Sequence, residues 1–266
     1  MIVQRVTVRN ARFQEWQALL TNRAKRQRSG EFVVQGVRPI TLAVRLGWEV
    51  RELLFDERRD LSPWARDLLD TTTAPVAVAP ELLRELGEKS GAAPELLAVV
   101  GMPTDDLGRI PASARLLVVV LDRPNSPGNI GTVVRSADAF GASGVVVTGH
   151  AADPYDPKAV RASTGSLFAV PVTRVGSHAE VLAWAAALEP PVQIVGTDEA
   201  GPTVAAEEDL TRPTLLVIGN ETVGLSAAWR EACDRLTRIP MVGTASSLNA
   251  AAAASVLLYE AARQRS

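Results

Sequence analysis

The chain has 266 residues, of which 47% are hydrophobic and 22% charged, and its formal net charge is −2. This length suits one large domain or two ordinary ones, and the composition excludes wholesale disorder. The single cysteine, Cys233, excludes a disulfide framework and a cysteine-rich metal cluster. The two histidines, His150 and His178, are far apart and lack ligand-like neighbours, so we expect no metal centre.

The sequence predicts neither an exported protein nor a membrane protein. Arginines interrupt the opening MIVQRVTVRN, where a signal peptide needs an apolar stretch. The longest apolar runs, LLVVVL at 116–121 and AAAAA at 250–254, are far shorter than the ~18 residues of a membrane span. We therefore expect a cytoplasmic protein.

Basic residues are concentrated at the start of the chain. Residues 1–30 hold one acid, Glu15, against the basic side chains of Arg5, Arg9, Arg12, Arg23, Lys25, Arg26 and Arg28. A local positive excess on a slightly acidic chain indicates a polyanionic partner. The same residues also suit a solvated helix face, and charge alone does not separate the two interpretations.

Two segments alternate strand-like and helix-like patterns, and a stretch rich in Gly, Pro, Asp and Ser at 101–115 separates them. We therefore predict two domains, 1–105 and 106–266. In the first, a small α/β domain, we expect helices at 11–27, 36–46, 62–70 and 80–88 and strands at 31–35, 48–55, 75–79 and 96–100.

The second segment predicts a mostly parallel sheet that is covered by helices on both faces, because continuous Val/Ile/Leu strands alternate with helices. We expect its strands at 116–121, 144–149, 168–172, 192–197, 214–219 and 236–240, and its helices at 127–140, 157–163, 177–188, 225–235 and 247–265.

Polar or Gly-rich loops follow three of these strands: DRPNSPGNIG at 122–131, GNETVG at 219–224 and MVGTASSLN at 241–249. The carboxyl ends of parallel strands meet at one edge of the sheet, so we expect the loops to converge on one cleft. Each loop alone also has a structural explanation, since Ser126-Pro127 suits a helix start and the glycines suit tight turns.

Several common catalytic motifs are absent from the sequence. It contains no G-x-G-x-x-G after a strand, no G-x-x-x-x-G-K-[ST] and no G-x-S-x-G. Cys233 is predicted inside the helix at 225–235, as a buried small residue rather than a nucleophile.

The three loops resemble the motifs of the SpoU (TrmH) branch of the SPOUT RNA methyltransferases, which make 2′-O-methylribose with S-adenosylmethionine. The similar segments are NSPGNIGTVVRSADAFGASG at 125–144, KAVRASTGSLFAVPV at 158–172, VIGNETVGLS at 217–226 and IPMVGTASSLNAAAAASVLLYEAARQR at 239–265. EFVVQGVRPI at 31–40 resembles, more weakly, the small RNA-binding domain of the ribosomal-RNA members. Gln35 departs from the usual glutamate there, and Ala251 from a frequent serine.

The resemblance implies an α/β fold with a C-terminal trefoil knot, and a homodimer with each active site near the subunit interface. It implies S-adenosylmethionine as the cofactor and no metal. The catalytic residues that it implies are Arg135, Asn129, Glu221, Ser247 and Asn249. The implied cofactor contacts are Thr197, Ile218, Gly219, Ile239, Met241, Ser247 and Leu248. For RNA we expect contacts from Arg161, Arg23, Lys25, Arg26 and Arg28.

Arg135 can be interpreted in two ways. The family proposal is a base that removes the 2′-proton. A guanidinium stays protonated at neutral pH, which favours a clamp on the target phosphate instead. The sequence alone does not decide between a base and a phosphate clamp.

The N-terminal domain favours 23S ribosomal RNA as the substrate, with uridine or adenosine as the target. An antibiotic-resistance enzyme of the avilamycin or thiostrepton type would fit. The alternatives are a transfer-RNA ribose 2′-O-methyltransferase, a non-catalytic RNA-binding protein of ribosome assembly, and a nucleotide-using enzyme that acts on a small molecule.

Overall fold

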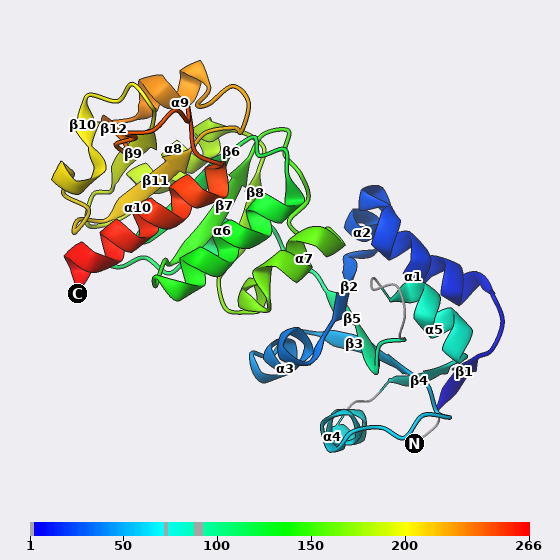
Figure 1. The fold of residues 1–266 in the computed structure, drawn as a ribbon. Coiled ribbons are helices and arrows are strands. Elements are labelled where there is room, and N and C mark those ends of the chain that lie inside the picture. Colours follow the sequence, from blue (N-terminus) through cyan, green and yellow to red (C-terminus); the bar gives the residue numbers. More distant parts are fainter. Residues whose placement is uncertain (1–2, 72–73, 88–92) are drawn as a thin grey trace. The chain divides into compact units, whose positions relative to one another are not determined.

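The computed structural model describes residues 3–71, 74–87 and 93–266, which form two compact units (Figure 1). The first unit extends to Pro103 and includes Tyr155–Phe168, and the second comprises Thr104–Pro154 and Ala169–Ser266. Residues 155–168, which lie inside the predicted domain 106–266, thus pack with the first unit. Both units alternate helices and strands, which confirms the predicted α/β class. Among the described residues, we find no helix with the length and apolarity that crossing a membrane requires.

A five-stranded mixed sheet in the order β1-β4-β3-β5-β2 is the centre of the first unit. Strand β5 is antiparallel to β2 and β3, whereas β4 is parallel to β1 and β3. The strands are β1 (Gln4–Val6), β2 (Glu31–Gln35), β3 (Val50–Phe55), β4 (Pro75–Val78) and β5 (Leu96–Gly101). The helices are α1 (Ala11–Thr21), α2 (Arg23–Ser29), α3 (Val37–Arg45), α4 (Pro63–Thr71), α5 (Pro80–Leu86) and α7 (Pro157–Ser163).

The single helix predicted at 11–27 is two helices, and Asn22 causes the break. Its backbone is extended, with φ −124° and ψ 107°, so it ends α1. Its side-chain oxygen then accepts the N–H of Lys25 at 3.1 Å and caps α2. Asparagine competes well for backbone groups at helix starts, which the helical periodicity of the sequence does not reveal.

Aromatic packing holds residues 155–168 in the first unit. Phe32 of β2 is fully buried, and its ring centroid lies 4.9 Å from that of Tyr155 and 6.2 Å from that of Phe168. Trp48 crosses the Phe168 ring edge-on at 5.0 Å, and its Nε1 donates to the Phe168 carbonyl at 3.0 Å. Such aromatic pairs stabilise a fold beyond their buried area.

A seven-stranded sheet in the order β10-β12-β9-β11-β6-β7-β8 forms the second unit, and all its strand pairs are parallel. The parallel sheet predicted from the sequence is therefore confirmed. The strands are β6 (Leu117–Asp122), β7 (Gly144–Thr148), β8 (Val172–Val175), β9 (Gln193–Thr197), β10 (Thr203–Val204), β11 (Thr214–Ile218) and β12 (Arg235–Arg238). The helices are α6 (Pro127–Ala139), α8 (His178–Ala186), α9 (Ala227–Ala232) and α10 (Ala250–Arg265).

The strand predicted at 168–172 is wrong in position. Residues Ser166–Phe168 form a turn of 3-10 helix, and β8 starts only at Val172. Phe168 packs with Phe32 and Trp48 instead of entering the sheet. Pro171 has no N–H to donate to a neighbouring strand, so the ladder begins after it.

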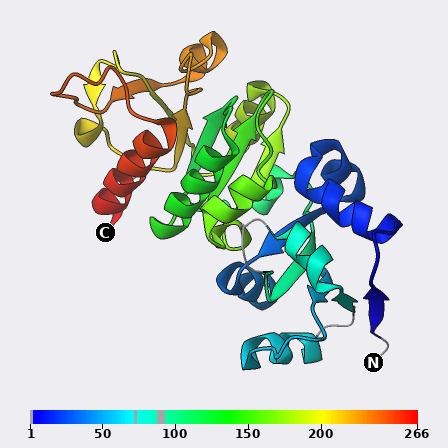
Figure 2. The same ribbon diagram turned by 45° about the vertical axis from the view of Figure 1, so that its right-hand side comes forward.

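The last helix, α10, lies beside α6 (Figure 1, Figure 2). Its buried face is made mainly of small and branched aliphatic residues, which are Ala251, Ala254, Leu257, Leu258 and Ala261. The hydroxyls of Ser136 on α6 and Ser255 on α10 are 2.7 Å apart and share a hydrogen bond. Helix α10 begins directly after Asn249, at the end of the 241–249 loop.

We predict that Phe32→Ala lowers the free energy of unfolding by about 3–5 kcal/mol, because it leaves a cavity among buried rings. Amides of α7 should exchange faster with deuterium, while those of β6 and β11 keep their protection. Urea unfolding and hydrogen-exchange mass spectrometry measure both effects. The exposed Val8→Ala variant should change stability by no more than about 0.5 kcal/mol. Unchanged exchange in α7 would contradict the packing described here.

Candidate functional site

The three predicted loops meet around one cavity of about 320 Å³ in the second unit. It opens at the carboxyl ends of β9, β11 and β12, as expected for a parallel sheet. Its volume falls within the roughly 300–1,000 Å³ of small-ligand sites. The lining residues include Thr197, Asp198, Glu199, Ile218, Gly219, Asn220, Glu221, Val223, Gly224, Arg230, Thr237, Ile239, Met241, Ser247 and Leu248.

The carboxylate of Glu221 joins the loop after β11 to the loop after β6. It accepts the backbone N–H of Asn125 at 3.0 Å and of Ser126 at 3.4 Å, and the side-chain amide of Asn129 at 2.9 Å. Burial raises the pKa of Glu221, but these hydrogen bonds stabilise the anion more strongly and the pKa lies below its ordinary value. The site therefore holds Glu221 as a carboxylate at neutral pH.

Asn129 and Asn249 connect this carboxylate to the last helix. The side-chain oxygen of Asn129 accepts the amide of Asn249 at 3.3 Å. The oxygen of Asn249 accepts the N–H groups of Ala251 and Ala252 and so caps α10. Asn249 thus caps α10 and also lies beside Asn129.

Tight backbone geometry shapes the floor of the cavity. Asn220 and Gly224 exchange two backbone hydrogen bonds of 3.0 Å, and Gly224 has a positive φ of 69°. A Cβ atom on Gly219 would lie 2.5 Å from the backbone of Gly224 and Leu225. Only glycine therefore fits at 219, where the chain turns directly out of β11.

An ion pair that sequence analysis did not identify also lines the cavity. Asp198 follows β9 and pairs with Arg230 of α9. Glu199 and Thr237 complete this side. Asp198 and Glu199 could have been predicted, because both come directly after a predicted strand and ligands bind at the carboxyl ends of parallel strands. No local pattern marks Arg230, because its partner is more than thirty positions away.

The structure brings together most of the predicted site residues. All seven residues predicted for the cofactor line the cavity, namely Thr197, Ile218, Gly219, Ile239, Met241, Ser247 and Leu248. Of the predicted catalytic residues, Asn129, Glu221 and Asn249 are linked by hydrogen bonds, and Ser247 lies on the cavity wall. Their roles stay predictions.

Arg135 is the exception among them. It lies on the exposed face of α6, and its side chain makes no hydrogen bond or ion pair within the described part of the chain. It is six residues from Asn129, which is roughly 9 Å along the helix axis and two thirds of a turn around it. Glu221 therefore holds loop amides and not Arg135.

The basic residues predicted to contact RNA differ in exposure. Arg23, Arg28 and Arg161 are exposed, and Lys25 is half-buried, 3.6 Å from Glu15. The structure contradicts the predicted RNA contact of Arg26, because its side chain is only 2% exposed. Its guanidinium donates to the Leu19 carbonyl at 2.8 Å and lies 3.5 Å from the Asp156 carboxylate, so it is a structural residue and cannot reach RNA.

Cys233 follows α9 instead of lying inside it. Burial raises the pKa of its thiol to about 12, and the neighbouring Asp234 charge acts in the same direction. The thiol therefore stays protonated at neutral pH and is no nucleophile. Among the described residues, no cluster of three or more His, Cys, Asp or Glu is placed to hold a metal ion.

Comparison with protein-family models identifies both parts of the chain. Residues 10–98 match the SpoU L30e-like domain, and residues 116–259 match the SpoU rRNA Methylase family. The chain belongs to the SpoU rRNA methylase family. The resemblance seen in the sequence is thereby confirmed.

Among its relatives in this family is a 23S rRNA (uridine(2479)-2′-O)-methyltransferase of Streptomyces viridochromogenes. It is 61% identical over 98% of this chain and 93% of the relative. The crystal structure of the SpoU methyltransferase AviRb from the same organism, in complex with AdoMet, has a TM-score of 0.93 and covers 97% of this chain and 98% of that one. An AdoMet-bound rRNA methyltransferase from Sinorhizobium meliloti is 30% identical, with a TM-score of 0.87 and 98% coverage of both chains.

We predict that Glu221→Gln is less stable than the unaltered SpoU methylase at pH 7 by roughly 1–2 kcal/mol, because charge-assisted hydrogen bonds to the loop are weakened. Because the pKa of Glu221 is lowered in the folded protein, its carboxylate stabilises the fold at pH values above the ordinary glutamate pKa. This stabilisation is lost as pH falls through the lowered pKa. Urea unfolding at pH 7 and in acid should show the difference shrink. The exposed cavity residue Glu199→Gln is the control, and an equal loss in both variants would contradict a special role for Glu221.

Proposed function

We propose that this protein transfers a methyl group from S-adenosylmethionine to the ribose 2′-oxygen of a nucleotide in 23S rRNA, with uridine as the favoured target. The observation that carries the proposal is 61% identity, over nearly the whole chain, to an enzyme named for that reaction. The convergence of the seven predicted cofactor residues on one cavity supports it as well.

The cavity residues fit S-adenosylmethionine. Ile218, Ile239, Met241 and Leu248 offer apolar surface to an adenine ring, and the backbone at Gly219 offers polar groups at close range. The carboxylates of Asp198, Glu199 and Glu221 lie on the same cavity and suit a cationic sulfonium. These are the chain's own means of holding the cofactor.

Bound there, S-adenosylmethionine supplies a methyl group that is already activated, so the protein has to place the ribose hydroxyl and assist the loss of its proton. Asn129 suits the first task, because Glu221 and Asn249 fix its amide on both sides. An asparagine amide has two N–H donors and two acceptor lone pairs, so Asn129 keeps one of each for a hydroxyl.

Arg135 serves as a phosphate clamp in this proposal. A guanidinium is a poor base but presents five donors, which suit a phosphate and the developing negative charge on a 2′-oxygen. The proton then leaves to solvent or to a phosphate oxygen. Arg135 is exposed and has no partner within the described residues, so its guanidinium is available to bind a phosphate of the substrate.

The division of labour follows the predicted domains, with RNA binding in 1–105 and methyl transfer in 106–266. The matches to the L30e-like domain and to the methylase family support this division. We further propose that residues 239–249 complete a trefoil knot, since they run from β12 past the 219–224 loop to α10. A ribosomal-RNA substrate agrees with a cytoplasmic protein.

A homodimer forms through α6 and α10 in this proposal. Ala252, Val256 and Tyr259 lie on one face of α10 at helical spacing, and Val256 and Tyr259 are 42% and 57% exposed. The Tyr259 ring meets Phe140 edge-on at 5.9 Å, which extends the apolar face to the end of α6. Because Arg135 is on the exposed side of α6, a partner on this face would bring Arg135 to the subunit interface.

The test of the reaction uses tritiated S-adenosylmethionine with separate pools of unmodified 23S, 16S and transfer RNA. We expect label only in 23S rRNA and, after alkaline hydrolysis, only in alkali-resistant dinucleotides. Arg135→Ala should lower the rate by roughly 10²–10³-fold while cofactor binding is kept. The exposed Arg45→Ala should leave cofactor binding and the chemical step unchanged. Label in mononucleotides would mean base methylation, and label in transfer RNA would identify the other substrate class.

The homodimer is tested by variants that place charges on the exposed apolar face of α10. We expect the unaltered chain to sediment as a dimer, and Val256→Glu combined with Tyr259→Glu to sediment as a folded monomer without methyl transfer, because buried carboxylates have no partner there. Val44→Glu, at an exposed valine of α3, should remain dimeric. Analytical ultracentrifugation distinguishes these states, and a monomeric, active unaltered chain would contradict the proposal.

A further inference from the structure

A second cavity, of about 400 Å³, lies in the first unit, away from the residues of the proposed reaction. Its size also falls in the roughly 300–1,000 Å³ range of ligand sites. It is bounded by the end of α1, the end of β2, the start of α3 and α7. The lining residues are Leu20, Val33, Gln35, Gly36, Val37, Arg38, Pro39, Leu86, Pro157, Val160, Arg161 and Thr164.

The walls of this cavity are mostly apolar. Val33, Leu86 and Val160 are buried, and Val37 at the mouth is 57% exposed. The uncharged polar side chains of the lining are Gln35, at the end of β2, and Thr164, which follows α7. Apolar walls suit the face of a nucleobase, which stacks on apolar and aromatic side chains.

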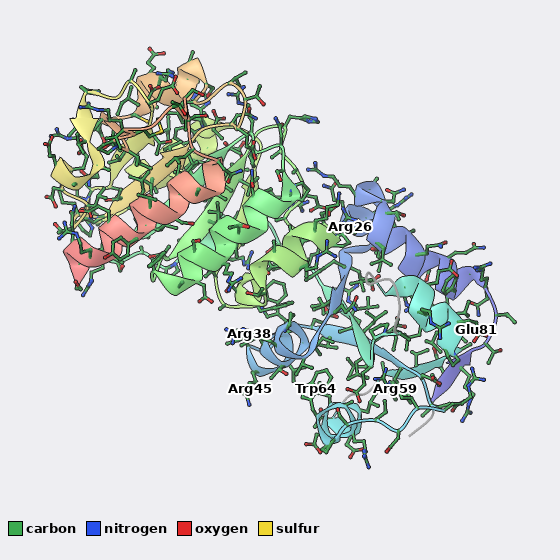
Figure 3. All side chains as sticks on the ribbon, in the orientation of Figure 1. Arg26, Arg38, Arg45, Arg59, Trp64 and Glu81 are labelled. Atoms are coloured by element: carbon green, nitrogen blue, oxygen red, sulfur yellow. The ribbon has the colours of Figure 1, made fainter. Side chains whose placement is uncertain are left out.

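The charge of the lining is entirely positive. Arg38 and Arg161 are its charged members, and it contains no acid. Arg38 is exposed, and its Nε donates to the Thr164 carbonyl at 3.2 Å. This contact joins the start of α3 to the end of α7 and leaves the two Nη groups of Arg38 without a partner in the described part of the chain. Figure 3 shows Arg38 and Arg45 both extending from α3.

The turn that closes the cavity is tightly packed. Thr164 ends α7 in the left-handed conformation with φ 49°, and Gly165 follows with φ 100°. A Cβ on Gly165 would lie 2.7 Å from Leu42 of α3. The α7 wall is therefore held firmly against α3, and the cavity is a built feature of the first unit.

We propose that this cavity binds a single unpaired nucleotide of the RNA substrate, with the base between the apolar walls and its phosphate against Arg38. The inference rests on the proposed RNA methyltransferase function, and adds an anchor outside the methyl-transfer site. An apolar peptide would use the same walls but would not require the positive mouth. Single-stranded RNA meets both conditions, because each base carries a phosphate.

The experiment compares variants on the exposed side of α3 in the full-length protein. Val37→Trp should fill the mouth and weaken the binding of unmodified 23S rRNA about tenfold, the scale of one stacked base. Val44→Trp is the matched control, since Val44 is exposed on the same helix but does not line the cavity. It should bind RNA as the unaltered protein does, and both variants should keep S-adenosylmethionine binding. For Val37→Trp, KM for RNA should rise while kcat at saturating RNA changes less than about twofold.

Arg38 is tested through the salt dependence of RNA binding. Arg38→Ala should lower the slope of log K against log salt by about one, which corresponds to one phosphate contact, and Arg38→Lys should keep the slope because it keeps the charge. Equal losses in Val37→Trp and Val44→Trp, or an unchanged slope in Arg38→Ala, would overturn this proposal while methyl transfer remained intact. An unaltered protein that binds S-adenosylmethionine but methylates no RNA would overturn the proposed function, and this inference with it.

Discussion

The Glu221 carboxylate accepts two backbone N–H groups and the Asn129 amide, and the geometry of the cavity in the second unit depends on that contact. It joins loops that are more than ninety residues apart in the sequence. Through Asn129 the contact reaches Asn249, which caps α10. One anion thus sets the loop after β6, the start of α6 and the start of the last helix. Without it, the N–H groups of Asn125 and Ser126 would lose their acceptor.

Arg135 is not the partner that stabilises the Glu221 charge. Backbone and amide N–H groups at the start of α6 stabilise the carboxylate, helped by the positive end of the helix. No arginine is needed for that purpose. Arg135 therefore lies on the exposed face of α6 without an ion pair among the described residues, as the proposed phosphate clamp requires.

Sequence patterns predicted the fold class and the convergence of the three loops on one cavity better than the detailed contacts. The parallel sheet follows from uninterrupted aliphatic strands, and the cavity follows from polar loops at strand ends, because both depend on local sequence. The break at Asn22 and the late start of β8 depend on a cap and on the packing of Phe168, which helical and strand periodicity do not encode. The pairing of Asp198 with Arg230 is a long-range contact and likewise has no local signal.

The basic start of the chain shows why a count of charges is a poor guide to an RNA surface. Arg5 pairs with Glu57, Arg9 with Glu85, Arg12 with Glu15 and Glu52, and Arg26 with Asp156. Much of the local positive excess is therefore neutralised within the fold. Exposed arginines lie on α2 and at the start of α3, where Arg38 lines a cavity whose walls are mostly apolar. Affinity for a polyanion then depends on few side chains, and the apolar cavity can add to it only if a base leaves its stack to enter.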